Sequence, residues 1–118
     1  MSTPRLLPAL AALAALAAGC GGGDPLDSEP VATTEEVSLP KSYKFEPVVI
    51  EVEQGATVTW ENEDSFTHTI RFDDEDDTAE LEPGDTFERE FAETGAFHYV
   101  CTLHPRDMEG EVRVRSAG

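Results

Sequence analysis

The stretch from residue 47 to residue 62, PVVIEVEQGATVTWEN, decides the fold class of this 118-residue chain. Apolar side chains alternate with polar ones on both sides of a turn signal at Gln54-Gly55. The alternating apolar residues are Val48, Ile50, Val52, Val58 and Trp60. A period of two residues is typical of a β-strand with one buried face. The stretch therefore predicts two strands joined by a short turn.

Four later stretches repeat this alternation. They are HTIRF (68–72), DTFEREF (85–91), GAFHYVC (95–101) and GEVRVR (110–115). The inward positions are His68, Ile70, Phe72, Phe87, Phe91, Phe97, Tyr99, Cys101, Val112 and Val114, with Glu111, Arg113 and Arg115 facing outward. Turn signals at Gly55, Pro83-Gly84, Gly95 and Gly110 separate the runs. Short strands at this spacing predict an all-β sandwich or small barrel with antiparallel or mixed strands and little helix.

The first residues have the pattern of an export signal. Arg5 precedes an apolar run, Leu6 to Ala18, which ends at Gly19-Cys20 and is too short to span a bilayer as a helix. We therefore expect residues 1–19 to be a cleaved signal peptide. The junction LAALAAGC resembles the lipobox of bacterial lipoproteins, which implies lipidation of Cys20 and a membrane-anchored product outside the cytoplasm or in the periplasm. The alternative is an ordinary cleaved signal and a soluble product.

Residues 20–42 are rich in Gly, Pro, Ser, Thr and acidic residues and have little apolar periodicity. This composition predicts a flexible acidic tether. One domain then remains, residues 43–118. Within it, the acidic run Asp73–Asp77 predicts a solvated loop, and a docking patch for a basic partner is the functional alternative.

The charge is strongly acidic, with 25 Asp and Glu against 8 Lys and Arg and a formal net charge of −17. Phosphate groups would be repelled by such a surface, so a nucleic-acid partner is excluded. A basic protein partner, or solubility in salty surroundings, fits this charge.

The segment YVCTLHPRDMEG (99–110) carries Cys101, His104 and Met108 within eight residues. Cys20 lies outside the predicted domain, so Cys101 has no plausible disulfide partner. His68 is the other histidine on an inward register, whereas His98 faces away from Cys101 and is interpreted as a surface residue. A thiolate, two imidazoles and a weak thioether form the ligand set of a blue-copper centre.

Three other interpretations of this cluster compete with a copper site. Zinc would accept one Cys and two His, but methionine is a poor zinc ligand and a fourth ligand is not evident. A Cys–His nucleophile lacks a third orienting group and an oxyanion-hole motif. The plainest alternative is a buried free cysteine with incidental polar neighbours.

At these residues the chain resembles the cupredoxins, a family of small Greek-key β-sandwich electron carriers that includes plastocyanins, amicyanins and halocyanins. The resemblance rests on FEPVVIEVEQGATVTWENEDSFTHTI (45–70) and LEPGDTFEREFAETGAFHYVCTLHPRDMEGEVRV (81–114). It implies seven or eight strands and one type 1 copper, bound by His68, Cys101, His104 and Met108.

The chain also departs from the family pattern. Three residues separate His104 from Met108, a spacing unlike that of plastocyanins or amicyanins, so Met108 is the least secure ligand. Thr69 stands where the family often has Asn, and we expect its hydroxyl to bond near Thr102. Val100 replaces an exposed Tyr of plant plastocyanins, which favours electron exit at the His104 edge.

The resemblance implies a carrier, not an enzyme, that shuttles single electrons between membrane or periplasmic redox proteins. Leu103 and Pro105 would form part of an apolar docking patch beside His104, and we expect weak, salt-sensitive encounters by a monomer. The alternative is a copper-binding protein for buffering or delivery, without obligate electron transfer.

Overall fold

The computed structural model describes residues 25–117. The predicted signal peptide (1–19) and the predicted lipidation site Cys20 lie outside the described residues. Within the described range, no helix is both long enough and apolar enough to cross a membrane.

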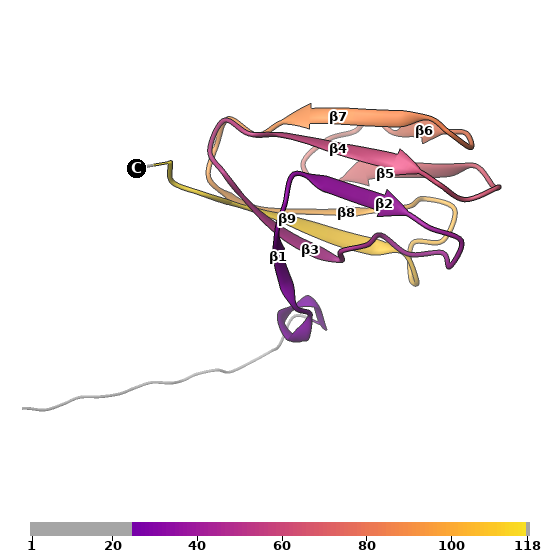
Figure 1. The fold of residues 1–118 in the computed structure, drawn as a ribbon, viewed down its shortest axis with the longest axis horizontal. Coiled ribbons are helices and arrows are strands. Elements are labelled where there is room, and N and C mark those ends of the chain that lie inside the picture. The colour runs from indigo at the N-terminus through magenta and orange to yellow at the C-terminus, as the bar shows by residue number, and fades with distance from the viewer. Residues whose placement is uncertain (1–24, 118) are drawn as a thin grey trace, which may run out of the picture.

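Nine strands and one short 3-10 turn make up the described fold (Figure 1). The turn is η2 (Pro25–Ser28), and the strands are β1 (Val31–Thr33), β2 (Glu36–Leu39), β3 (Val49–Glu53), β4 (Thr57–Asn62), β5 (His68–Phe72), β6 (Ala79–Leu81), β7 (Thr86–Glu90), β8 (Gly95–Val100) and β9 (Glu109–Arg115). The all-β prediction is confirmed, with nine strands in place of the seven or eight expected.

The strands form two sheets. One has six strands in the order β1-β3-β9-β8-β5-β6, and the other has three in the order β2-β4-β7. The pairs β1–β3, β3–β9 and β2–β4 are parallel, and the remaining pairs are antiparallel. Figure 1 shows β2, β4 and β7 side by side in one layer, with β3, β9 and β8 in the other. The architecture is therefore a mixed β-sandwich.

Aromatic side chains fill the space between the sheets. Trp60 is completely buried, and its ring meets those of Phe72 and Tyr99 edge-on at centroid distances of 5.6 and 5.4 Å. Edge-to-face contacts of this kind add to the free energy of apolar burial. The prediction that Trp60 and the phenylalanines belong to the core is confirmed for Trp60, Phe45, Phe72 and Phe91, whereas Phe87 and Phe97 are only partly buried. It is wrong for Phe66, which is 58% exposed.

The prediction of a tether over residues 20–42 is wrong for its second half. β1 pairs with β3, β2 pairs with β4, and the side chains of Val37 and Leu39 are buried in the core. Both strands are short and lie at sheet edges, where backbone hydrogen bonds to a partner far along the chain stabilise segments of unremarkable composition. The folded domain thus begins well before Tyr43.

Two expectations about β9 are also wrong. Glu111, predicted to face solvent, is 6% exposed and its carboxylate accepts a hydrogen bond from Arg113 Nε at 2.9 Å. β9 lies between β3 and β8, so even its polar side chains are crowded by neighbours on both sides. Gly110, predicted to be a turn residue, lies within β9 opposite Tyr99, and a Cβ there would lie 2.5 Å from the Tyr99 ring.

Candidate metal centre

Antiparallel pairing of β5 with β8 brings His68 close to Cys101. Arg71 pairs with Val100 and Phe72 with Tyr99, so the first residues of β5 lie beside the residues that follow β8. Both side chains are fully buried, and Nδ1 of His68 lies 3.9 Å from Sγ of Cys101. Two of the four predicted ligands therefore meet at one end of the sandwich.

The loop from Cys101 to Met108 is closed by its own backbone. The Cys101 N–H donates to the Met108 carbonyl at 2.9 Å, and the Met108 N–H donates to the His104 carbonyl at 2.9 Å. Met108 is fully buried within the core cluster that also contains Cys101. The three-residue spacing between His104 and Met108 thus forms a compact turn that returns the methionine to the interior.

Hydrogen-bond donors surround the Cys101 sulfur. The Thr69 N–H lies 3.4 Å and the Thr69 hydroxyl 3.6 Å from Sγ. Burial by itself would raise the pKa of the Cys101 thiol, but hydrogen bonds from the Thr69 N–H, the Thr69 hydroxyl and the Leu103 N–H outweigh burial and lower that pKa below its ordinary value. The site therefore favours the thiolate, which is the form that binds metal ions.

The expected contact between Thr69 and Thr102 is confirmed. Their hydroxyls lie 2.7 Å apart, and the Thr102 N–H donates to Thr69 Oγ1 at 2.7 Å. Thr69 thereby connects the start of β5 to the loop that carries Cys101. The Thr69 hydroxyl therefore makes the hydrogen bond near Thr102 that the sequence predicts for this position.

Asp64 is a residue of the site that strand periodicity does not identify. Its carboxylate lies 2.8 Å from Nε2 of His68 in a buried position. The hydrogen bond from His68 is the main reason why the pKa of Asp64 lies below its usual value. A carboxylate acceptor fixes the proton on Nε2, which leaves Nδ1 free to face Cys101. Glu61, Glu63 and Asp64 are close together in the sequence, so composition gave no reason to single out one carboxylate.

His104 lies at the edge of this group. Its ring centroid is 6.3 Å from that of His68 and 4.8 Å from that of Tyr43. Within residues 25–117, no three side chains of His, Cys, Asp or Glu are gathered closely enough to form a complete metal-binding cluster. The structure thus places His104 near the His68–Cys101 pair, but the three side chains do not surround a single metal position.

The donor atoms nevertheless suit copper. A thiolate-favouring sulfur, an imidazole with a free Nδ1 and a buried thioether lie at one end of the sandwich, with a second imidazole at its edge. Soft sulfur ligands favour Cu(I), and imidazoles suit Cu(II) as well. The residues that would hold the metal are His68, Cys101, His104 and Met108.

His98 is separate from this group. Its Nδ1 lies 2.8 Å from Asp73 and its Nε2 2.7 Å from Glu109. The ring is about one-third exposed, as expected for a histidine that faces away from Cys101.

All five residues of the acidic run Asp73–Asp77 are exposed, as predicted for a solvated loop, but several of them form ion pairs. Besides the contact between Asp73 and His98, Arg89 forms ion pairs with Asp74 and Glu75. The Arg89 guanidinium also lies over the ring of Phe72, 4.4 Å from its centroid. Three of the five residues of this run, Asp73, Asp74 and Glu75, therefore bind their own loop to the sandwich.

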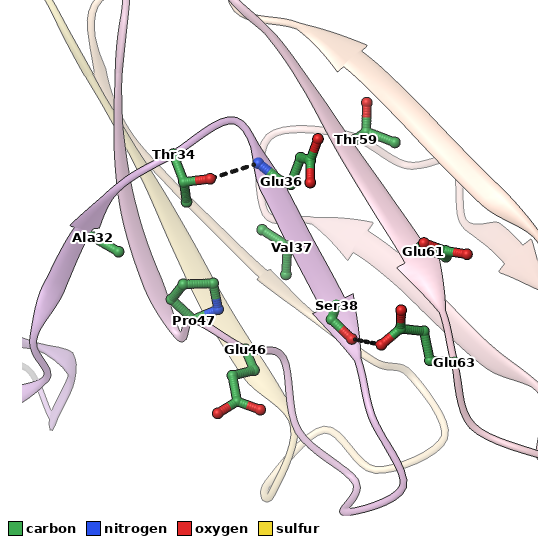
Figure 2. Close-up of a pocket in the computed structure, with 10 residues that line it drawn as sticks. All are labelled: Ala32, Thr34, Glu36, Val37, Ser38, Glu46, Pro47, Thr59, Glu61 and Glu63. Atoms are coloured by element: carbon green, nitrogen blue, oxygen red, sulfur yellow. Dashed lines mark hydrogen bonds between the residues drawn. The ribbon is translucent and has the colours of Figure 1, made fainter.

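A separate groove of about 490 Å³ lies away from these residues, between β2, β4 and the segment before β3 (Figure 2). Figure 2 shows Glu36 and Ser38 on β2, Glu61 and Glu63 on or after β4, and Glu46 beside Pro47. The Ser38 hydroxyl donates to Glu63 at 2.6 Å. The groove contains none of the predicted ligands and extends the acidic character of the surface.

Known proteins resemble the chain along most of its length. The family model described as a cupredoxin-like domain matches residues 9–114. Amicyanin-alpha of Methylorubrum extorquens is 31% identical over 112 residues, which cover 90% of this chain and 92% of that protein. Halocyanin of Natronomonas pharaonis is 39% identical over 80 residues, 61% of this chain and 48% of the halocyanin.

Solved structures share the fold. The purple cupredoxin from Nitrosopumilus maritimus matches with a TM-score of 0.65 and 30% identity, over 70% of this chain and 100% of that chain. A copper-containing nitrite reductase from Thermus scotoductus matches with a TM-score of 0.61 and 27% identity, over 85% of this chain but 25% of that chain. Homologues of the chain among the cupredoxins bind a single type 1 copper. Because the family model spans most of the sequence and the sandwich agrees with these structures, the chain belongs to the cupredoxin-like family.

Proposed function

We propose that this protein is a type 1 copper protein that shuttles single electrons between redox partner proteins. His68, Cys101 and His104 would be the equatorial ligands, and Met108 the weak axial ligand. The observation that carries the proposal is the 3.9 Å approach of His68 Nδ1 to Cys101 Sγ, with Nε2 of the same ring occupied by Asp64. Its relatives are electron-transfer copper proteins, which supports the same function here.

Burial and hydrogen bonding of the ligands suit electron transfer. Copper in such a site would supply a one-electron couple. The chain contributes a sulfur whose charge is stabilised by Thr69 and an imidazole whose tautomer is fixed by Asp64. Ligands that are already oriented need little rearrangement when the charge of the metal changes, and small rearrangement favours fast electron transfer.

The apolar surface beside His104 is the proposed docking area. Three large apolar side chains are exposed around it: Leu103 by 55%, Phe66 by 58% and Tyr43 by 44%. Pro105 is exposed as well. A partner with basic residues around an apolar contact would be attracted by the acidic surface, and the encounter would weaken as salt is added.

Copper delivery is the competing function. The same ligands would serve it, but a donor must release its metal readily to an acceptor. Cys101 and Met108 are both completely buried, which favours retention of copper through many redox cycles. The rate of copper transfer to a Cu(I) acceptor separates the two functions, because slow transfer combined with fast electron exchange identifies a carrier.

We also propose that the protein is a carrier and not an enzyme. The nitrite reductase that shares its fold is matched over 25% of its length, which corresponds to one part of a larger protein. Within residues 25–117, the cysteine and histidines that could bind copper supply one candidate site, at His68, Cys101 and His104. An assay for nitrite reduction with a generic electron donor should therefore give no turnover.

Export and lipid anchoring complete the proposal. The support is the basic start, the apolar run and the LAALAAGC junction before Cys20. Ten residues, 21–30, would separate a lipidated Cys20 from β1, which begins at Val31, and four of them are folded as η2 (Pro25–Ser28). Cys20→Ser should move the protein from the membrane fraction to the soluble fraction or leave it uncleaved. Recovery of the unmodified protein in the cytoplasm would contradict export.

The decisive test is spectroscopic. Addition of Cu(II) to the purified full chain should give an intense visible band from charge transfer between thiolate and copper, together with a type 1 EPR signal. Cys101→Ser should abolish the band. His98→Ala is the matched control, because it removes an imidazole outside the proposed site and should leave the spectrum unchanged. If the unmodified protein shows no such band, the blue-copper assignment is wrong.

A further inference from the structure

We propose that Tyr43 is a positioning residue that holds the His104 imidazole at the mouth of the copper site. This inference rests on the proposed function, since His104 matters here as a ligand. The Tyr43 ring lies 4.8 Å from the His104 ring, at an interplanar angle of 62°, and 5.9 Å from the His68 ring, at 76°. One side chain therefore contacts both imidazoles edge-on, while the two imidazole centroids are 6.3 Å apart.

These contacts suit the electrostatics of aromatic rings. Edge-to-face pairs are attractive because the positive ring edge of one partner meets the negative face of the other. Tyr43 would therefore stabilise the His104 ring in the orientation that this contact defines.

The backbone of Tyr43 is strained. Its φ angle is +52°, and within residues 25–117 it is the one residue other than glycine with a positive φ. An aromatic side chain in this left-handed region costs free energy that glycine avoids. Such strain persists where neighbouring structure imposes it, and it is concentrated at functional sites. Core packing does not require the tyrosine, because its side chain is 44% exposed.

The loop that carries Tyr43 is fixed at both ends. Ser38 and Glu46 exchange two backbone hydrogen bonds of 2.8 Å each, and Phe45 is completely buried. On its outer side, the Tyr43 ring stacks with Phe66 at 6.2 Å, and the Phe66 carbonyl accepts a hydrogen bond from buried Asn62. The Tyr43 ring thus contacts both Phe66, whose backbone is held by Asn62, and His104.

This arrangement predicts what Tyr43 does for the metal. With His104 confined, the imidazole would leave a bound ion less often, and the site would exchange copper slowly. An aromatic pair of this kind corresponds to about a fivefold change in an equilibrium or rate constant. Removal of the ring should accelerate copper release by about that factor.

The test compares four variants of the full chain: Tyr43→Phe, Tyr43→Ala, Tyr43→Gly and Val31→Ala. Val31 is the matched control, because it is an apolar residue of similar exposure, 45%, on β1. Copper release to a chelator should be faster in Tyr43→Ala and Tyr43→Gly, and close to the unmodified rate in Tyr43→Phe and Val31→Ala. Rescue by phenylalanine is expected because the ring, and not the hydroxyl, makes the contacts.

Tyr43→Gly separates positioning from stability. Relief of the positive φ should offset the lost packing, so its thermal midpoint should stay within a few degrees of the unmodified protein even though copper release is faster. Equal release rates in Tyr43→Ala and the unmodified protein would overturn the inference. So would faster release that merely follows a fall in thermal midpoint across all the variants.

A second measurement needs no copper. The imidazole proton resonances of His104 should carry a ring-current shift in the unmodified protein and in Tyr43→Phe, and lose it in Tyr43→Ala. Unchanged His104 resonances in Tyr43→Ala would overturn the contact itself. Absence of the thiolate band in the unmodified protein would instead refute the proposed function, so the two failures are distinguishable.

Discussion

Asp64 and His68 form a buried hydrogen bond in which the carboxylate lies 2.8 Å from Nε2 of the imidazole. A carboxylate behind a metal-binding histidine orients the ring, fixes its tautomer and makes it a stronger donor. In a copper site it would also favour Cu(II) over Cu(I), because a nearby negative charge stabilises the higher charge on the metal.

Replacement of Asp64 by asparagine should therefore raise the reduction potential, by tens of millivolts. Asn keeps the size and a hydrogen-bond acceptor but removes the charge. Protein-film voltammetry of Asp64→Asn and Asp64→Glu would measure the effect, with Glu expected to lie closer to the unmodified protein. A potential that falls in Asp64→Asn would show that the carboxylate does not act through its charge.

The Thr69 hydroxyl should contribute to both the stability of the fold and the spectrum of the copper site. Its Oγ1 accepts the Thr102 N–H and approaches Cys101 Sγ, so Thr69→Val leaves a partly buried N–H without its acceptor and the sulfur without one donor. The expected cost is about 1 to 2 kcal/mol in the free energy of unfolding, with a shifted thiolate-to-copper band. Thr69→Ser is the control, since it keeps the hydroxyl. Equal behaviour of Val and Ser would show that only side-chain volume matters at this position.

Gly110 is required by the Tyr99 ring. An added Cβ would meet Cζ and the hydroxyl oxygen of Tyr99 at 2.5 Å, and neither belongs to a flexible chain end. Gly110→Ala should lower the free energy of unfolding by about 1 to 3 kcal/mol, a typical cost of overpacking. Chemical denaturation measures it.

The Tyr99 partner can be tested in a double-mutant cycle. Because Tyr99→Leu removes the ring that would clash, Gly110→Ala should cost much less in that background than in the unmodified protein. Additive effects of the two substitutions would contradict the close approach.

His98 should give the domain a pH-dependent contribution to stability. Burial would lower its pKa, but the hydrogen bonds to Glu109 and Asp73 outweigh burial and hold that pKa above its usual value. A raised pKa in the folded state means that the imidazolium stabilises the fold. The contribution is complete below the unfolded-state pKa of about 6.5 and is lost as pH rises through the folded-state pKa.

The measurement is denaturant unfolding of His98→Gln and the unmodified protein between pH 5 and pH 9. The difference in stability should be at most about 1 kcal/mol, since the ring is partly exposed, and it should shrink as pH rises. A difference that grows with pH would mean that neutral His98 is the stabilising form.

Sequence periodicity was sufficient to predict the sandwich and the neighbourhood of the candidate site. The alternation in HTIRF and GAFHYVC placed His68 and Cys101 on inward registers, and the β5–β8 pairing brings them together. Periodicity reports only which face of a strand is buried. It could not identify Asp64 or Tyr43, because both lie in loops whose positions depend on contacts between distant segments. Gly110 shows the same limit, since its requirement comes from a ring on the adjacent strand.

The N-terminal boundary shows why composition can mislead and leads to a last prediction. Residues 36–39 read EVSL, a four-residue alternation too short to stand out within an acidic and polar stretch, yet Val37 is 2% exposed and Leu39 is fully buried. Burial of two such side chains contributes about 3 to 6 kcal/mol, comparable with the whole stability of many domains.

A chain that begins at Tyr43 should therefore fail to fold cooperatively, because it lacks β1 and β2 and exposes the edges of β3 and β4. A chain that begins at Pro25 should unfold like the full protein. Leu39→Ala in the full chain is the matched test of the buried contact, with an expected loss of about 2 to 5 kcal/mol. Calorimetry or circular dichroism on these proteins would measure the transitions. A sharp transition at an unchanged midpoint in the chain from Tyr43 would show that residues 31–39 are the tether that their composition suggests.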